Sequence, residues 1–233
     1  MRIKIAILLF LLPLAGKSQF FGLGFQTNLG IPVLDLRDEV GGLVFPEFNT
    51  LGIYKFTTIP IEVGLSVGYG VYNTSLEKRR DLYPGYNDEL RLRRNNNLLT
   101  VMGMFRYFPE VKRTAILPFI EIQAGANYFY TRYKIRESRF DDPIEEGRDF
   151  SDWVAALRFG GGLKIPFKKA ESGYFEFKIL YHESGKVEFL RKNDTQYLPD
   201  QGDGEFVYSP ISSQIKMIQP GIGVILYMNP SDY

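Results

Sequence analysis

The chain has 233 residues, a formal net charge of +1 and no cysteine. Its length suits one domain, and its balanced charge gives no bias toward nucleic acid or acidic partners. The absence of cysteine excludes disulfides, thiolate catalysis and cysteine-ligated metals, and we expect neither a metal nor a cofactor.

The first 18 residues have the pattern of a secretory signal peptide. Arg2 and Lys4 form a basic start, residues 5–15 form a short apolar stretch, and small residues precede a cleavage site after Ser18. We therefore expect the mature domain to occupy residues 19–233. No later apolar run approaches the roughly 18 to 20 residues that a membrane helix needs.

Seven later segments alternate bulky apolar side chains with glycine, small polar or charged ones. In the clearest, residues 61–71, the odd positions are Ile, Val, Leu, Val, Tyr and Val, and the even positions are Glu, Gly, Ser, Gly and Gly. Side chains of a strand alternate between its faces, so the apolar set lies on one face. With an eighth segment of less clear alternation, 48–57, the predicted strands are 20–31, 48–57, 60–72, 97–108, 118–132, 152–165, 174–184 and 214–228.

Short and long connections alternate between these strands. The short ones are residues 57–60, 109–117 and 166–173, and the long, polar ones lie near 32–47, 73–96, 133–151 and 185–213. Short turns at one rim and long loops at the other are typical of outer-membrane barrels. We therefore predict an all-β fold, an eight-stranded antiparallel up-and-down transmembrane β-barrel with short periplasmic turns and long extracellular loops.

A soluble lipocalin-like barrel, with its apolar face inward, is the alternative fold. Glycine on the charged face, aromatic residues near apolar strand ends and the unequal loops favour the membrane barrel. Its interior would then hold seven charged side chains: Glu62, Arg106, Glu121, Arg158, Lys164, Glu176 and Lys178. Eight strands leave a lumen that side chains just fill, so these charges should pair into a plugged polar core. A gated proton or ion path is the alternative function of that core.

One pattern suggests catalysis. His182, the only histidine, and Ser184 lie two residues apart on a predicted strand, so the imidazole could activate the hydroxyl. This resembles the His-x-Ser pair of outer-membrane lipid A deacylases. However, Gly185 stands where that family has asparagine, and Glu188, the possible third member, follows at a shorter spacing. Since both side chains should point into the lumen, we expect no enzyme; a lipid A-modifying hydrolase is the alternative.

Charged loops suggest two further ligands. The acidic runs 141–146 and 200–205 offer oxygen ligands for Ca²⁺, but neither has EF-hand spacing, and solvated loops are the commoner explanation. In the long segment 73–96, six Lys and Arg residues outnumber four Asp and Glu residues. Bidentate arginines suit lipopolysaccharide phosphates, although such a loop is more often simply solvated.

Residues 105–108, 117–126 and 159–166 are similar to strand motifs of the small outer-membrane β-barrel proteins of Bacteroidota, of the OmpA/OmpX type. This resemblance covers essentially the whole mature chain. It implies an integral outer-membrane protein surrounded by outer-membrane lipid and lipopolysaccharide. It also implies an accessory or docking role beside a larger barrel or surface lipoprotein, in secretion, barrel assembly or nutrient uptake.

Contact residues for such a partner are expected in the long loops. Aromatic residues and arginines are enriched at protein interfaces. The candidate contact residues are Tyr83, Tyr86, Arg91, Tyr197 and Tyr208.

Overall fold

The computed structural model describes residues 20–56, 58–83, 85, 88–110, 115–169, 172–192, 194–198 and 205–228. The predicted signal peptide, the candidate contact residue Tyr86 and most of the acidic run 200–205 lie outside these ranges. Within the described part, no helix is long and apolar enough to cross a membrane.

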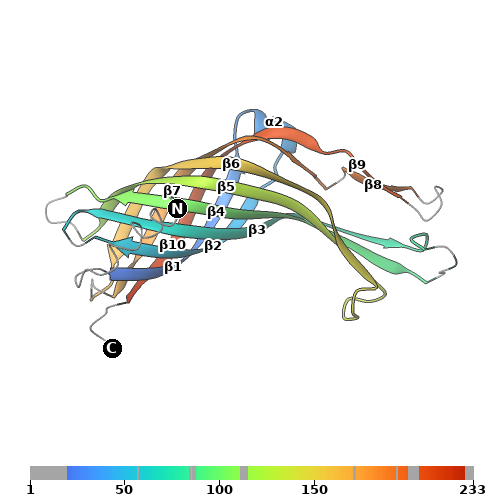
Figure 1. Ribbon diagram of the computed structural model, residues 1–233, viewed down its shortest axis with the longest axis horizontal. Coiled ribbons are helices and arrows are strands. Elements are labelled where there is room, and N and C mark those ends of the chain that lie inside the picture. The colour runs from blue at the N-terminus through green and yellow to red at the C-terminus, as the bar shows by residue number, and fades with distance from the viewer. Residues whose placement is uncertain are drawn as a thin grey trace, which may run out of the picture.

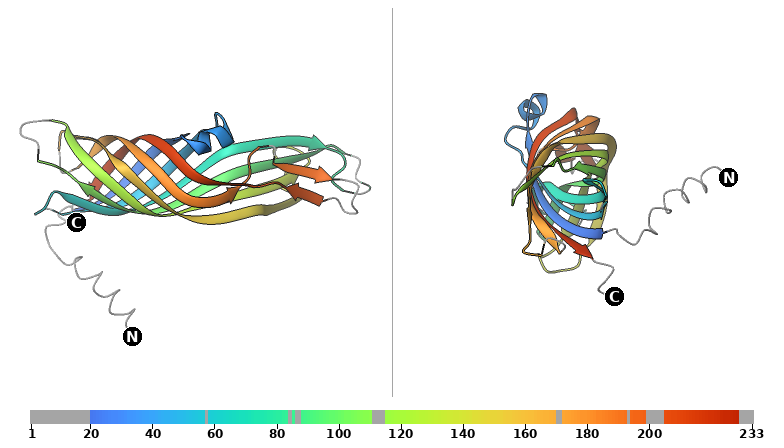
Figure 2. Two further views of the ribbon diagram at one scale, coloured as in Figure 1. Left: turned by 90° about the horizontal axis from the view of Figure 1, so that it is seen from above. Right: turned by 90° about the vertical axis from the view of Figure 1, so that its left-hand side faces the viewer.

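Eight long strands close into one antiparallel barrel, which confirms the predicted fold (Figures 1 and 2). They are β1 (Phe20–Pro32), β2 (Phe45–Lys55), β3 (Ile61–Arg79), β4 (Leu90–Tyr107), β5 (Leu117–Arg136), β6 (Glu145–Pro166), β7 (Gly173–Phe189) and β10 (Ile211–Met228). Each strand pairs with the next long strand along the chain, and β1 pairs with β10 to close the ring. Between the long strands lie the helix α2 (Asp35–Val40) and a small hairpin of β8 (Thr195–Leu198) and β9 (Glu205–Tyr208).

The outside of the barrel is apolar and the inside is polar. Phe25, Ile179 and Ile222 are 56%, 61% and 58% exposed, whereas their strand neighbours Gln26 and Lys178 are buried. A continuous exposed apolar wall is costly in water, at roughly 25 cal/mol for each Å². The same wall is favourable against lipid, and it matches the outward-facing band of membrane barrels. The alternation therefore predicts correctly which side chains face outward and which face the lumen.

Strands β3 to β6 run well past their predicted ends, and so does β7, which continues to Phe189. β3 continues to Arg79, β4 begins at Leu90, β5 continues to Arg136 and β6 begins at Glu145. The prediction of long loops at 73–96 and 133–151 is therefore wrong, since most of both segments is paired strand. These two hairpins project beyond the barrel, as Figure 1 shows, and we call them the extension.

The cause of this error is local. Bulges between Val71 and Asn73 and beside Thr131 shift the register, which reverses the alternation of β3 and β6. Beyond the bulges, toward the extension, β3 and β6 carry polar side chains on both faces, although their backbone pairing with β4 and β5 continues. A hydrophobic pattern therefore ends where the apolar wall ends, several residues before the strand does.

Glycine permits close strand packing on the inner face. A Cβ atom placed on Gly160 would lie 2.2 Å from the carbonyl oxygen of Ile179, which is a backbone atom and cannot move aside. Comparable distances at Gly70 and Gly125 are 1.9 and 2.0 Å. These positions need glycine because neighbouring backbone approaches closely.

We therefore predict that Gly160→Val prevents closure of the barrel or destabilises it by at least ~1–3 kcal/mol, the usual cost of overpacking. Gly42→Val is the matched control, because a Cβ at Gly42 meets no atom within 4 Å. The measurement is the heat-dependent gel mobility of the protein after folding in detergent, together with urea unfolding. Equal stability of the two variants would contradict this account of the glycine.

Candidate functional site

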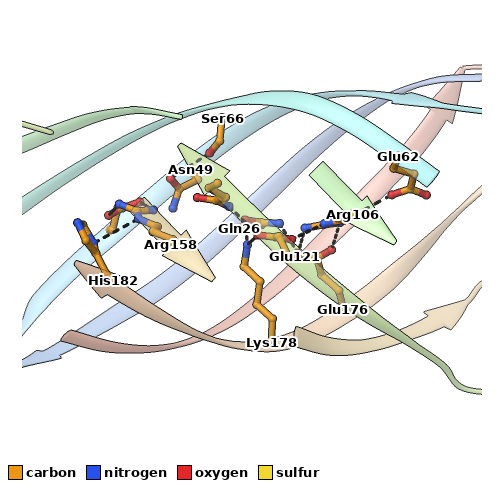
Figure 3. Close-up of polar contacts among 12 residues, drawn as sticks. Gln26, Asn49, Glu62, Ser66, Arg106, Glu121, Arg158, Glu176, Lys178 and His182 are labelled. Atoms are coloured by element: carbon orange, nitrogen blue, oxygen red, sulfur yellow. Dashed lines mark hydrogen bonds and ion pairs between the residues drawn. The ribbon is translucent and has the colours of Figure 1, made fainter. Parts of the chain in front are cut away.

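The centre of the barrel interior is organised around Arg106, which is fully buried. Its Nη1 atom donates to Glu176 at 2.6 Å and to the hydroxyl of Tyr174 at 2.9 Å, and its Nε atom donates to Glu121. Glu121 lies opposite Arg106 on β5, and Glu62 lies opposite it on β3, so the strand register itself brings these groups together (Figure 3). The planar guanidinium suits this arrangement because its donors fork toward several carboxylates at once.

Lys178 extends the same network across the lumen. Its Nζ atom donates to Glu121 at 3.0 Å and to the side-chain oxygen of Gln26 at 2.8 Å (Figure 3). Gln26 in turn donates to Glu176. Two glutamates, one arginine and one lysine therefore share a single group of charge-assisted hydrogen bonds.

Toward the strand ends joined by short turns, Lys164 pairs with Glu62 at 3.3 Å. Tyr174 and Tyr227 both donate their hydroxyls to the same Glu62 carboxylate. The Lys164 ammonium also lies 4.0 Å from the ring centre of Tyr174, where the aromatic face attracts a cation. All seven charged residues predicted for the interior thus lie there.

The sequence prediction missed one interior charge. Glu47 on β2 is fully buried and accepts two hydrogen bonds from Arg158, at 2.8 and 2.9 Å. Its strand has apolar residues on both faces, with Phe48 outside and Leu51 inside. Alternation alone therefore does not show which face of β2 points into the lumen. The buried Asn49, two residues away, was the signal that could have placed Glu47 inside. With Glu47, four interior carboxylates face four interior cations.

An apolar layer covers this polar core at the end of the barrel that carries the extension. Tyr72, Phe129 and Phe189 pack edge to face or tilted against one another. Leu36 of α2 is fully buried in the same cluster, so the short helix closes the layer from the side of the first loop. The interior is thus filled by paired charges and, above them, by aromatic and aliphatic side chains.

The candidate catalytic residues are placed as follows. His182 is buried beside Arg158, whose Nε atom donates to His182 Nδ1 at 3.2 Å (Figure 3). Ser184 donates to the carbonyl of Gly185 at 2.8 Å and accepts from the amide of Ile215 at 3.2 Å. The register shift near Ser184 reverses the alternation of β7, so the side chain of Glu188 is on the outer face. The structure therefore does not assemble these three groups, and His182 and Ser184 face the lumen.

The extension has a small core of its own. Leu82, Leu90, Leu92 and Ile135 are buried there, and Tyr83, Tyr133, Tyr197 and Phe206 pack against them. The Tyr197 hydroxyl donates to the carbonyls of Asp81 and Leu82, both at 3.0 Å, which fastens the β8–β9 hairpin to the tip of the β3–β4 hairpin. Of the candidate contact residues, the structure brings Tyr83, Tyr197 and Tyr208 together on one side of the extension and places Arg91 on the other.

One carboxylate binds two tyrosines in this core. Tyr133 donates to Glu145 at 2.5 Å and Tyr83 donates to the other oxygen at 2.6 Å. The hydrogen bond to Glu145, together with burial, raises the pKa of Tyr133 to about 12. Burial, with Glu145 as the second cause, also raises the pKa of Tyr83. Part of the candidate contact surface is thus occupied in holding the extension together.

The structure also shows a candidate contact residue that the prediction missed. Phe140, in the turn between β5 and β6, is 90% exposed, and Ile144 beside it is 50% exposed. A single aromatic residue in the polar run from Arg136 to Asp142 is the sequence signal that could have identified it. As for the acidic run 141–146, the described part of the chain holds no group of three or more His, Asp or Glu side chains arranged to bind a metal ion.

Removal of the central arginine should be strongly destabilising. We expect Arg106→Met to lower the free energy of unfolding by ~3–5 kcal/mol, because it leaves buried carboxylates unpaired. The control is Arg132→Met, which breaks an exposed ion pair with Glu146 and should cost no more than about 1 kcal/mol. Urea unfolding in detergent micelles measures both values. An equally small loss for both variants would contradict the assigned role of Arg106.

The tyrosine pair predicts a dependence on high pH. A pKa raised on folding means that neutral Tyr133 contributes stability that is complete below its ordinary value of 10 and is lost as the pH rises through about 12. The difference in absorbance at 295 nm between wild type and Tyr133→Phe should therefore titrate near pH 12. When Glu145→Gln is added to both wild type and Tyr133→Phe, the midpoint of this absorbance difference should fall toward pH 10. A midpoint near 10 with Glu145 intact would refute the assignment.

No family model and no curated protein matches the chain. The solved structures that are similar to the chain include the following three. The major outer membrane protein of Thermus thermophilus is 12% identical with a TM-score of 0.47, over 88% of this chain and 99% of that one. Neisserial surface protein A is 7% identical at 0.41, over 89% and 96%. The N-terminal barrel domain of Pseudomonas aeruginosa OprF is 12% identical at 0.37, over 89% and 97%. The assignment of this chain to a closed eight-stranded barrel rests on its own strand pairing.

Proposed function

We propose that this protein is a non-enzymatic, integral outer-membrane β-barrel that serves as an accessory or docking subunit of a larger outer-membrane complex. The filled interior is the observation that carries the proposal. Four carboxylates pair with four cations in the lumen, and an apolar layer covers them. With the interior occupied in this way, the outer wall and the extension are the surfaces that remain for function.

The outer-membrane location is supported by the distribution of polar groups. A closed barrel satisfies every backbone hydrogen bond between its strands, which is what a strand-built protein needs in lipid. The apolar side chains face outward and the charges inward. The signal-peptide pattern of the first 18 residues agrees with export, and the resemblance to Bacteroidota barrels belongs to this same proposal.

The extension supports docking for two reasons. First, among the described residues its sheet has two edges without a paired strand, since the pairing of β3 with β2 ends at Tyr69 and the pairing of β6 with β7 begins at Ala156. Unpaired strand edges can accept a strand from another chain. Second, Phe140 and Ile144 form an apolar point at the tip of the β5–β6 hairpin. Exposed aromatic residues of this kind often anchor protein interfaces.

The test is a mild-detergent purification of the tagged protein from native outer membranes, with partners quantified by mass spectrometry. We expect a larger barrel or surface lipoprotein at near-equal amounts, and Phe140→Asp should reduce its recovery at least tenfold, as expected for an interface anchor. Ile59→Asp is the control, because Ile59 is 45% exposed in a short turn at the opposite end of the barrel.

The outcomes separate the parts of the proposal. Recovery of the same partner with wild type and Phe140→Asp would remove the tip of the β5–β6 hairpin as the contact. A barrel that purifies alone would overturn the accessory role itself. In that case, conductance in a planar bilayer and the lipid A composition of a His182→Ala strain would test the channel and hydrolase alternatives.

A further inference from the structure

One face of the extension carries an unusual concentration of positive charge. This cationic face consists of Lys78, Arg91, Arg93, Arg132, Lys134, Arg136 and Arg148. The strand register places Arg91 directly opposite both Lys78 and Arg136, and it places Arg93 opposite Lys134. Like charges directly opposite each other on one sheet face are destabilising. The four strands therefore bear an electrostatic cost that a bound anion would remove.

The acids of the extension compensate only part of this charge. Glu146 pairs with Arg132 at 3.0 Å and with Lys134 at 2.6 Å, and Glu89 pairs with Lys78 at 2.6 Å. Within the described residues, no carboxylate forms an ion pair with Arg91, Arg93 or Arg136. These three arginines lie along a groove of about 500 Å³. Arg93 donates one hydrogen bond to Asn95 at 3.2 Å and Arg136 donates one to the carbonyl of Arg139 at 3.3 Å. A guanidinium has five N–H donors, so the other donors of these arginines are left for a ligand.

The cationic face begins where the membrane wall ends. Arg148 lies over the rings of Tyr128 and Tyr130, with 5.5 and 5.2 Å to their centres, and donates to the Tyr128 hydroxyl at 2.5 Å. Tyr128 also stacks on the exposed Trp153 at 4.3 Å. Tyrosine and tryptophan gather at the boundary between lipid tails and headgroups. Arg132 stands two residues above Tyr130, about 7 Å at the usual strand rise.

The cationic face is also the upward continuation of the lipid-facing wall. On β5 the outward positions run without interruption from Ile122 through Tyr130 to Arg132 and Arg136. The face therefore looks sideways. Its lower edge, at Arg132, lies next to the boundary that the tyrosines mark, and Arg136 stands farther along the strand, about 13 Å beyond Arg132. A soluble anion would not need this position, whereas a lipid that stands beside the barrel occupies it.

We propose that the cationic face binds the phosphate groups of a phosphorylated glycolipid of the outer leaflet, of the lipid A type. Arginine suits this ligand because its fork can bind two phosphate oxygens at once. The acyl chains of such a lipid would lie against the apolar wall below the tyrosines. The inference depends on the proposed outer-membrane location and is independent of any protein partner.

The experiment uses the full chain folded in detergent micelles, with bound lipid counted by native mass spectrometry. The probes are bisphosphorylated lipid A, the same lipid after removal of both phosphates, and inorganic phosphate alone. We expect wild type to retain bisphosphorylated lipid A and to lose most binding when the phosphates are absent. The triple variant Arg91→Gln, Arg93→Gln, Arg136→Gln should bind on the order of 100-fold more weakly, since each cation near an anionic membrane surface contributes about a factor of five.

The control variant is Arg37→Gln, Lys168→Gln, Lys169→Gln, which removes the same charge elsewhere and should bind lipid A like wild type. Equal binding of lipid A with and without phosphates would overturn the proposal, as would equal binding by the two triple variants. If inorganic phosphate binds as tightly as lipid A, the ligand is free phosphate and the lipid assignment fails. Should the arginine variant not fold, the comparison of the two lipids on wild type still decides the question.

Discussion

The barrel depends on the neutralisation of charge inside a closed wall. Arg106 and Arg158 are large, fully buried cations, and each is tolerated only because carboxylates from other strands meet its guanidinium. A buried charge without a partner costs several kcal/mol, so the interior groups stabilise the fold only as a complete set. This constraint explains why the polar lumen is filled, and under the proposed function it leaves the outer surfaces for binding.

The outer surfaces divide into layers that follow the strands upward. An apolar wall comes first, then a belt with Tyr128 and Trp153, and then the polar sheet of the extension with its own small core. Strands β3, β4, β5 and β6 run through all three layers, so the backbone ladder joins the extension directly to the barrel. The two sides of the extension differ. One side packs aromatic side chains under the β8–β9 hairpin, and the other side is the cationic face.

The sequence predicted most of what depends on apolar alternation. The strand phase, the closed fold and seven interior charges follow from it, because a side chain of the wrong kind on either face would be costly. Glu47 was not predicted, since β2 has apolar residues on both faces. The extension was not predicted either, because register shifts and polar side chains hide strands that the backbone continues. The candidate contact residues follow from residue type alone, and type does not distinguish Tyr197, which fastens a hairpin, from the exposed Phe140.

Some interior ion pairs connect strands that are distant along the chain. Lys164 meets Glu62 across 102 positions, and Arg158 meets Glu47 across 111. During biogenesis, a partly inserted sheet would therefore present half of each pair to lipid. Unpaired charges in lipid are costly, so we expect the strands to enter the bilayer together, as a largely closed sheet, and not one at a time.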